Sequence, residues 1–184
     1  MTTSLVITLI GPDRPGLVKA LAARAADCGA NWMESNLAQL AGKFAGIVRL
    51  EIADAEAGKL EAALRELEAE GLRLTMERGT AAGAGSLHRA MAIEIVGHDR
   101  PGIVREISTV LARHNASIDR LESACESASF SGEPLFRARI DVHLPVSVLP
   151  ATIQGELETL ANELMVDLRV VPDDERPTAS PPRT

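Results

Sequence analysis

The chain has 184 residues, of which 46% are apolar and 24% charged, a composition typical of one or two globular domains. Its net charge of -7 and aromatic content of 2% argue against direct binding to nucleic acid, which needs a positive surface or stacking side chains. The same charge argues against docking on a membrane, and no run of 18 apolar residues predicts a membrane span. The first residues lack the basic region of a signal peptide, so the expected compartment is the cytoplasm.

The sequence contains an internal repeat. The segment GPDRPGLV at 11–18 returns as GHDRPGIV at 97–104, with six of eight positions identical and an offset of 86 residues. A short apolar strand pattern precedes each copy, and an amphipathic helix pattern follows it. The helical positions expected to face the core are Leu17, Val18, Leu21, Ala22 and Ala25, and in the second copy Ile103, Val104, Ile107, Val110 and Leu111.

The other elements also match between the copies. Each copy is predicted to run strand, helix, strand, strand, helix, strand, which gives an α+β fold of two tandem ferredoxin-like (βαββαβ) domains. Alternating apolar residues at 44–52 and 136–144 resume the match at an offset of 92 and predict the inward face of the third strand. The predicted second helices and last strands lie at 60–67 and 72–78 in the first copy, and at 153–164 and 166–171 in the second.

These elements predict the domain organisation. The first domain is expected over 1–78 and the second over 91–171, joined by a Gly- and Ala-rich linker at 79–90 and followed by a Pro-rich, disordered tail at 172–184. Each domain is near the lower size limit for a stable core, so mutual packing or a homo-oligomer is expected. Ala45 and Ile47 make the outer face of one strand apolar, which suggests that this face is covered.

The repeated motif lies at the turn between the first strand and the first helix of each domain. The N–H groups of Gly16 and Leu17, at the positive end of the helix dipole, can bind a small carboxylate. Asp13 can then bind the ammonium group of the same amino acid, and the second copy offers the same groups. The motif also suits a turn without any ligand, because an Asp here is often a helix cap and Pro15 fits the first helical position.

No other constellation predicts chemistry. The four histidines and two cysteines lack metal-ligand spacing, and no nucleophile or phosphate-binding motif occurs, so no catalytic residue, metal or cofactor is predicted. Cys28 and Cys125 are expected to be small packed residues. His98 lies inside the second turn, where it either contacts a ligand carboxylate or is a solvated turn residue.

Two copies of a strand, the motif G-x-D-R-P-G-[LI]-V and a helix resemble a tandem ACT-domain protein, and the length is similar to that of the glycine cleavage system transcriptional repressor family. ACT domains are small regulatory modules that bind amino acids near this turn. The resemblance implies that the start of the second strand lies beside the turn and adds a residue to the site. The implied ligand-binding residues are Gly11, Asp13, Arg14, Gly16, Leu17 and Asn31, and Gly97, His98, Asp99, Arg100, Gly102, Ile103 and Ser117.

The same resemblance implies an amino-acid-responsive regulator, with glycine or serine as the first expected ligand. In the family, repression is thought to work by antagonising a LysR-type activator, not by direct DNA binding, and the acidic charge agrees with that. An alternative is a regulatory subunit or module that controls a metabolic enzyme of amino-acid or one-carbon metabolism. An enzyme in its own right is least favoured, because the sequence offers no acid–base or nucleophile set.

Overall fold

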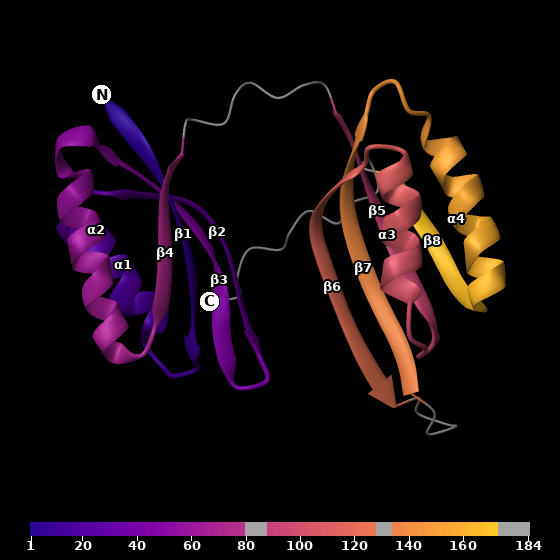
Figure 1. The fold of residues 1–184 in the computed structure, drawn as a ribbon, viewed down its shortest axis with the longest axis horizontal. Coiled ribbons are helices and arrows are strands. Elements are labelled where there is room, and N and C mark those ends of the chain that lie inside the picture. Colours follow the sequence, from indigo (N-terminus) through magenta and orange to yellow (C-terminus); the bar gives the residue numbers. More distant parts are fainter. Residues whose placement is uncertain (80–87, 128–133, 173–184) are drawn as a thin grey trace. The chain divides into compact units, whose positions relative to one another are not determined.

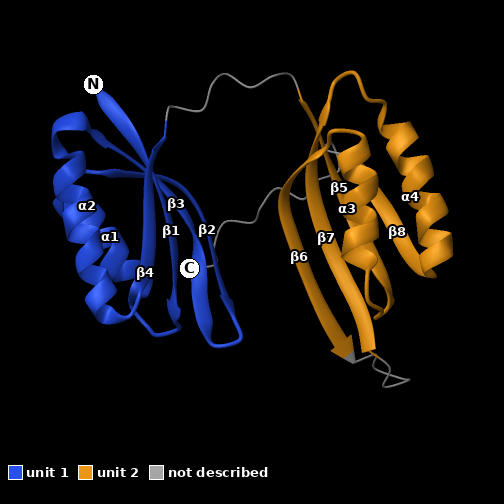
Figure 2. Cartoon of the chain, in the orientation of Figure 1, with its two compact units in different colours: residues 1–84 blue, residues 85–184 orange. Residues whose placement is uncertain are grey.

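The computed structural model describes residues 1–79, 88–127 and 134–172, and the chain divides into two compact units, 1–84 and 85–184 (Figure 2). The elements of unit 1 are β1 (Thr2–Pro12), α1 (Leu17–Asp27), β2 (Asn31–Leu40), β3 (Lys43–Ala53), η1 (Asp54–Glu56), α2 (Ala57–Arg65), η2 (Glu66–Glu70) and β4 (Arg73–Gly79). Those of unit 2 are β5 (His88–His98), α3 (Ile103–Arg113), β6 (Ser117–Ser127), β7 (Pro134–Pro145), α4 (Pro150–Leu164) and β8 (Val166–Pro172).

Each unit is a four-stranded sheet with its helices packed on one face (Figure 1). The strand order is β2-β3-β1-β4 in unit 1 and β6-β7-β5-β8 in unit 2, and all neighbouring strands are antiparallel. The two units therefore share one topology, which confirms the predicted tandem ferredoxin-like fold. The β1–α1 turn and the β5–α3 turn lie at equivalent places in it.

The strand register confirms the offsets of the repeat. Ile7 pairs with Val48 in unit 1, and Ile93 pairs with Ile140 in unit 2. The first members of these pairs are 86 residues apart and the second members 92, as the sequence predicts. All four side chains are buried on the helix-facing side of their sheets. The residues inserted before 134 therefore lengthen the second copy without changing which side chains face the core.

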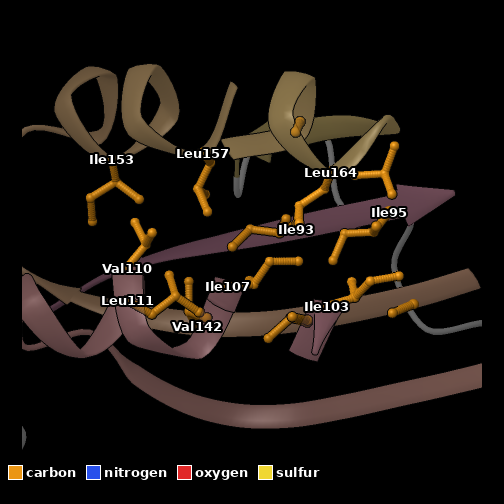
Figure 3. Packing of buried hydrophobic residues seen from close by; sticks show 14 of the residues in the cluster. Ile93, Ile95, Ile103, Ile107, Val110, Leu111, Val142, Ile153, Leu157 and Leu164 are labelled. Atoms are coloured by element: carbon orange, nitrogen blue, oxygen red, sulfur yellow. The ribbon is translucent and has the colours of Figure 1, made fainter. Parts of the chain in front are cut away.

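Each unit has its own apolar core between sheet and helices. Figure 3 shows Ile93 on β5 near Ile107 on α3 and Leu157 and Leu164 on α4. None of these four side chains is more than 2% exposed. Burying one such side chain contributes about 1.5–3 kcal/mol, so these contacts, more than helix propensity, hold the helices on the sheet.

Val18 and Val104 correct the predicted core. They are 44% and 38% exposed, although the sequence pattern placed both on the buried helix face. In α1 the buried residues are Leu17, Leu21 and Ala25, a row of i, i+4 and i+8 neighbours that leaves the next position to the side. Both valines follow the repeated turn directly, so each turn has an exposed apolar side chain next to it.

The outer faces of the two sheets differ. In unit 1 this face carries Ile10 and Ile47, each 46% exposed. In unit 2 the position equivalent to Ile47 is Arg139, which forms ion pairs with Glu94 (2.8 Å) and Asp141 (3.4 Å). The predicted apolar outer strand is therefore present in unit 1, whereas the second sheet has a charged face.

The predicted linker and tail fall mostly outside the described residues. β4 runs to Gly79 and β5 begins at His88, so the sheets take in both ends of the segment predicted as a linker. Residues 80–87 between them lie outside the described part of the chain. β8 ends at Pro172, and the rest of the predicted tail, 173–184, also lies outside it.

Candidate functional site

The backbone of the two repeated turns is set by a glycine before each helix. Gly16 has φ 92° and Gly102 has φ 102°, a left-handed conformation that other residues rarely adopt. Because this conformation interrupts the helical run, α1 begins at Leu17 and not at Pro15, which corrects the predicted first helical position. The N-cap residue is therefore a glycine, and Asp13 does not occupy the capping position.

A second glycine in each turn is required by close packing. A Cβ on Gly97 would lie 2.4 Å from Val166 Cγ1 and 2.9 Å from Val166 Cα. A Cβ on Gly11 would lie 2.9 Å from the carbonyl oxygen of Gly71. The chain crosses directly over the end of the first strand as it enters the last strand of each unit. This crossing is the cause of the crowding at both glycines.

Backbone hydrogen bonds tie both turns to the neighbouring strands. The N–H of Asp13 donates to the carbonyl of Gly42 (3.0 Å), in the β2–β3 hairpin. The N–H of Asp99 donates to the carbonyl of Pro134 (3.1 Å), where β7 begins. Each turn is thus hydrogen-bonded on one side to the residue that leads into β3 or begins β7, and on the other side it lies against the start of the last strand.

The arginine of the first turn has a carboxylate partner. Arg14 forms a hydrogen-bonded ion pair with Glu70, the last residue of η2. Both side chains are partly exposed. Glu70 was not predicted as a site residue, because the run 61–70 has the composition of a solvated helix face. Only the crossing of this segment over the first strand brings Glu70 to the turn.

The second turn arranges its charges differently. Arg100 makes no hydrogen bond or ion pair with any described residue, and its Nε atom is buried without a partner. Cys125 on β6 is exposed and not packed as predicted, and its thiol lies beside Asp99. Desolvation raises the pKa of this thiol, and the negative charge and hydrogen bond of Asp99 raise it further. Glu106 lies in the first turn of α3. One of its carboxylate oxygens is 3.4 Å from the point where a Cβ on Gly102 would lie.

Asn31 and Ser117 do not lie beside the turns of their own units, which corrects the placement expected for them. Asn31 pairs with Glu51 on β3, whereas Gly11 pairs with Phe44, seven residues away along that strand. At 3.3 Å per residue this is a separation of about 23 Å. Ser117 is displaced from Gly97 by the same seven positions along β7. The second strand runs parallel to the first, so it begins at the far end of the sheet.

A hollow of about 390 Å³ opens beside the second turn. Gly97 and His98 are among its lining residues, so it touches the end of the turn that leaves β5. The other walls come from β7, the end of α4 and the start of β8, including Asn162, Met165 and Asp167. None of these three was predicted, because they belong to the second half of the domain and carry no motif.

The structure adds no sign of a metal centre. Among the residues that it describes, no group of three or more His, Cys, Asp or Glu side chains is arranged to hold a metal ion. No helix in the described ranges is long and apolar enough to cross a membrane. The groups that the two turns do offer are the backbone N–H groups at the helix starts, an arginine and carboxylates, which suit a small polar ligand.

Comparisons with known proteins agree with this architecture. Residues 3–77 and 91–154 each match a family model described as an ACT domain. The glycine cleavage system transcriptional repressor of Escherichia coli (strain K12) is 28% identical over 161 residues, which cover 87% of this chain and 85% of that protein.

Two solved structures match almost the whole chain. A Galdieria sulphuraria protein described only as unknown is 28% identical, with a TM-score of 0.78, covering 94% of this chain and 99% of the other. A structure described as a glycine cleavage system transcriptional repressor has a TM-score of 0.70 at 19% identity, covering 93% and 97%. The chain therefore belongs to the ACT-domain family, with two tandem ACT domains, and over most of its length it is similar to the glycine cleavage system transcriptional repressors.

Proposed function

We propose that the chain is a cytoplasmic, amino-acid-responsive regulatory protein that controls transcription through a protein partner. The observation that carries the proposal is the similarity to a transcriptional repressor across both domains, 87% of this chain and 85% of the relative. A match confined to one domain would support only a small ligand-binding module. The proposal assigns the chain no reaction of its own.

The proposed ligand is a small amino acid, glycine or serine first, bound at one or both repeated turns. Its carboxylate meets the N–H groups of Gly16 and Leu17, or those of the equivalent residues in unit 2. Its ammonium approaches Asp13 or Asp99. The space beside Gly16 is open, since a Cβ placed there would meet no atom within 4 Å, so a ligand can approach the backbone at this residue.

The proposed partner is a protein, such as a LysR-type activator, and not DNA itself. The net charge of -7 opposes contact with a phosphate backbone, which binds through released counterions and needs Lys and Arg on the protein. On the described outer face of the second sheet, the arginines Arg137 and Arg139 are ion-paired with carboxylates of the same sheet. That face therefore presents no net positive patch to a nucleic acid.

Thermal unfolding in the presence of each of the twenty amino acids tests the ligand. A ligand at 100 times its Kd stabilises the folded state by about 2.7 kcal/mol, which is readily measured as a rise in Tm. We expect a rise with glycine or serine and none with acetate or methylamine at the same concentration. If no amino acid at millimolar concentration changes the Tm or gives heat in calorimetry, regulation passes through protein contacts alone.

Co-purification with tagged protein tests the partner. A transcription regulator of the LysR type, identified by mass spectrometry and reconstituted from purified components, supports the proposal. A metabolic enzyme whose activity changes on adding the purified chain supports the alternative of a regulatory subunit. The proposal predicts that neither complex needs DNA, so nuclease treatment should leave the interaction intact.

A homo-oligomer is part of the proposal, with the apolar outer face of the first sheet as its contact. Ile10 and Ile47 are both half-exposed on that face, and large exposed apolar side chains in a cluster commonly mark interfaces. Ile47→Glu should lower the sedimentation coefficient. Gln154→Glu, on the exposed side of α4, adds the same charge and should not. If sedimentation is unchanged by Ile47→Glu, the oligomer, if any, forms elsewhere.

A further inference from the structure

The same arginine of the repeated motif has a partner in one unit and none in the other. In unit 1, Arg14 is held by Glu70. In unit 2, Arg100 has no hydrogen bond or ion pair to any described residue, and its Nε atom is buried and unsatisfied. The two turns have matching glycine conformations and matching backbone anchors, so this difference lies in the side chains alone.

The cause of the difference is a single position before the last strand. In unit 1, Glu70 precedes Gly71, which has φ 91° and starts the crossing into β4. In unit 2 the residue with the equivalent left-handed conformation is Met165, with φ 53°, and the residue before it is Leu164. Leu164 is 2% exposed and belongs to the core. Unit 2 thus places a buried apolar side chain where unit 1 places the carboxylate.

A buried N–H donor without an acceptor is unfavourable, and a guanidinium group is especially demanding because its five donors form a rigid fork. A carboxylate satisfies two of those donors at once in a bidentate pair. Arg100 is partly buried, so part of its side chain is still exposed to solvent while its Nε atom is not. The hollow lined by Gly97 and His98 adjoins the same turn.

The other charges around the second turn are negative. Asp99 faces Cys125, and Glu106 lies close to Gly102 at the start of α3. Glu106 also contacts Arg105 at 3.4 Å, a long and exposed ion pair that neutralises it only partly. A ligand that is only an anion would be repelled by both carboxylates. A ligand that carries an ammonium beside its carboxylate would satisfy both kinds of group.

Resting on the proposed function, we propose that the two turns are not equivalent: the second turn binds the amino acid, with Arg100 as its carboxylate partner, and Glu70 occupies the first. Glu70 acts as a built-in substitute for a ligand carboxylate. The protein therefore binds one amino acid per chain through a zwitterion-selective site in unit 2. Unit 1 keeps the turn as a structural element.

Isothermal titration calorimetry with glycine, serine and acetate tests this assignment. Wild-type protein should bind one amino acid per chain and should not bind acetate. Arg100→Gln should weaken binding by about tenfold or more, as expected for loss of a charge-assisted pair. The matched control is Arg120→Gln on β6, which is 48% exposed and removes the same charge away from the turn. It should leave the Kd within twofold.

Glu70→Ala tests the other half of the proposal. Removing this carboxylate should free Arg14 and raise the stoichiometry from one amino acid per chain toward two. Adding Arg14→Gln to Glu70→Ala should return it to one. Circular dichroism shows whether each variant is folded, and since both Arg14 and Glu70 are partly exposed, neither change removes a core contact.

The calorimetry can contradict the inequality of the two turns without contradicting amino-acid binding itself. Two equal sites in the wild type, or binding that Arg100→Gln leaves unchanged, would overturn the inequality of the turns while keeping the chain an amino-acid-binding protein. Binding of acetate as strong as that of glycine would overturn the zwitterion-selective site. If the folded wild type binds no amino acid, the ligand of the proposed function is wrong as well.

Discussion

The two repeated turns share a backbone but not a set of side-chain partners. Gly16 and Gly102 adopt nearly the same left-handed conformation, and both turns are tied to the adjacent strands by one backbone hydrogen bond. Yet Arg14 is ion-paired, whereas Arg100 is not paired with any described residue. The motif therefore specifies the shape of a turn, and residues far from it in the sequence decide what the turn can bind.

This separation has a physical basis. Backbone shape depends on φ and on steric fit, which the glycines and prolines inside the motif set locally. Charge pairing depends on whichever segment crosses the turn, and here that segment is more than fifty residues away. A duplicated motif can thus keep its geometry in both copies while one copy gains or loses a ligand-binding group.

The largest expected effects come from the separate cores. Leu60→Ala in unit 1 and Leu157→Ala in unit 2 each remove a fully buried side chain, which should cost about 2–5 kcal/mol of unfolding free energy. Trp32, the single tryptophan, packs against the core of unit 1. Leu60→Ala should therefore shift the denaturant midpoint of tryptophan fluorescence, and Leu157→Ala should shift the circular dichroism signal more than the fluorescence.

Equal shifts of fluorescence and circular dichroism in both variants would contradict the expectation that each unit unfolds separately. That result would mean that the two units unfold as one cooperative body, although each has its own core. Differences between the turns would then be transmitted from one unit to the other through stability. Ligand binding in unit 2 would have to be measured with unit 1 fully folded.

The next largest effects concern the glycines at the strand crossings. Gly97→Ala brings a Cβ to 2.4 Å from Val166 Cγ1, and Gly11→Ala brings one to 2.8 Å from Leu72 Cδ2. Each substitution should destabilise its unit by about 1–3 kcal/mol, a typical cost of overpacking. Gly97→Ala should cost more, because the Cβ contact is shorter and Val166 is less flexible at Cβ than leucine is at Cδ.

Helical glycines serve as matched controls for these two substitutions. Gly58 in α2 and Gly155 in α4 would gain a Cβ with no atom within 4 Å. Replacing either by alanine should stabilise its helix by up to about 1 kcal/mol, the difference in helix propensity. If Gly97→Ala is as well tolerated as Gly155→Ala in a urea titration, the last strand does not cross the turn as closely as the structure has it.

The fold could be predicted because the repeat fixes the order and phase of the elements. Ile7 and Val48 recur at offsets of 86 and 92 as Ile93 and Ile140, and the period-2 pattern around them, clearest where Ile140 lies between Arg139 and Asp141, indicates which side of each strand is buried. Two copies of one pattern also exclude accidental periodicity. The burial of the third strand in both units follows from this signal alone.

Much of the site could not be predicted, because it depends on which strand ends meet. Asn31 was expected beside the turn, but the strand order places it about 23 Å away. Glu70 and Cys125 lie at the turns, yet nothing in their local sequence marks them. The start of α1 was misjudged because the proline rule for first helical positions ignores a left-handed glycine that follows the proline.

A smaller effect is expected from breaking the ion pair that closes the first turn. Arg14 and Glu70 are 45% and 38% exposed, so solvent screens their attraction, and Glu70→Ala should cost no more than about 1 kcal/mol. The loss should shrink further in 1 M salt, where the Debye length is about 3 Å. A loss above about 2 kcal/mol that salt does not reduce would mean that Glu70 stabilises the turn by packing.

The smallest expected effect is a change in the reactivity of Cys125, which leaves stability untouched. Its counterpart in unit 1 is Gln39, since both pair with the phenylalanine that faces the turn glycine. Desolvation and the nearby Asp99 carboxylate raise the pKa of the Cys125 thiol. Cys125 is exposed, but at pH 8 its reactive thiolate is scarcer than in a cysteine of ordinary pKa, so alkylation by iodoacetamide should be slow.

Asp99→Asn removes one of the two causes of that raised pKa, so the pKa should fall and the rate at pH 8 should rise. Asp167→Asn is the control, because it removes the same charge at another position. All rates are measured in a Cys28→Ala background, so that Cys125 is the thiol that reacts. A bound amino acid whose ammonium lies beside Asp99 should raise the wild-type rate in the same direction and should have no effect on Asp99→Asn. A pH–rate profile that Asp99→Asn does not shift would remove Asp99 from the surroundings of the thiol, and with it the carboxylate that the second turn offers to an ammonium.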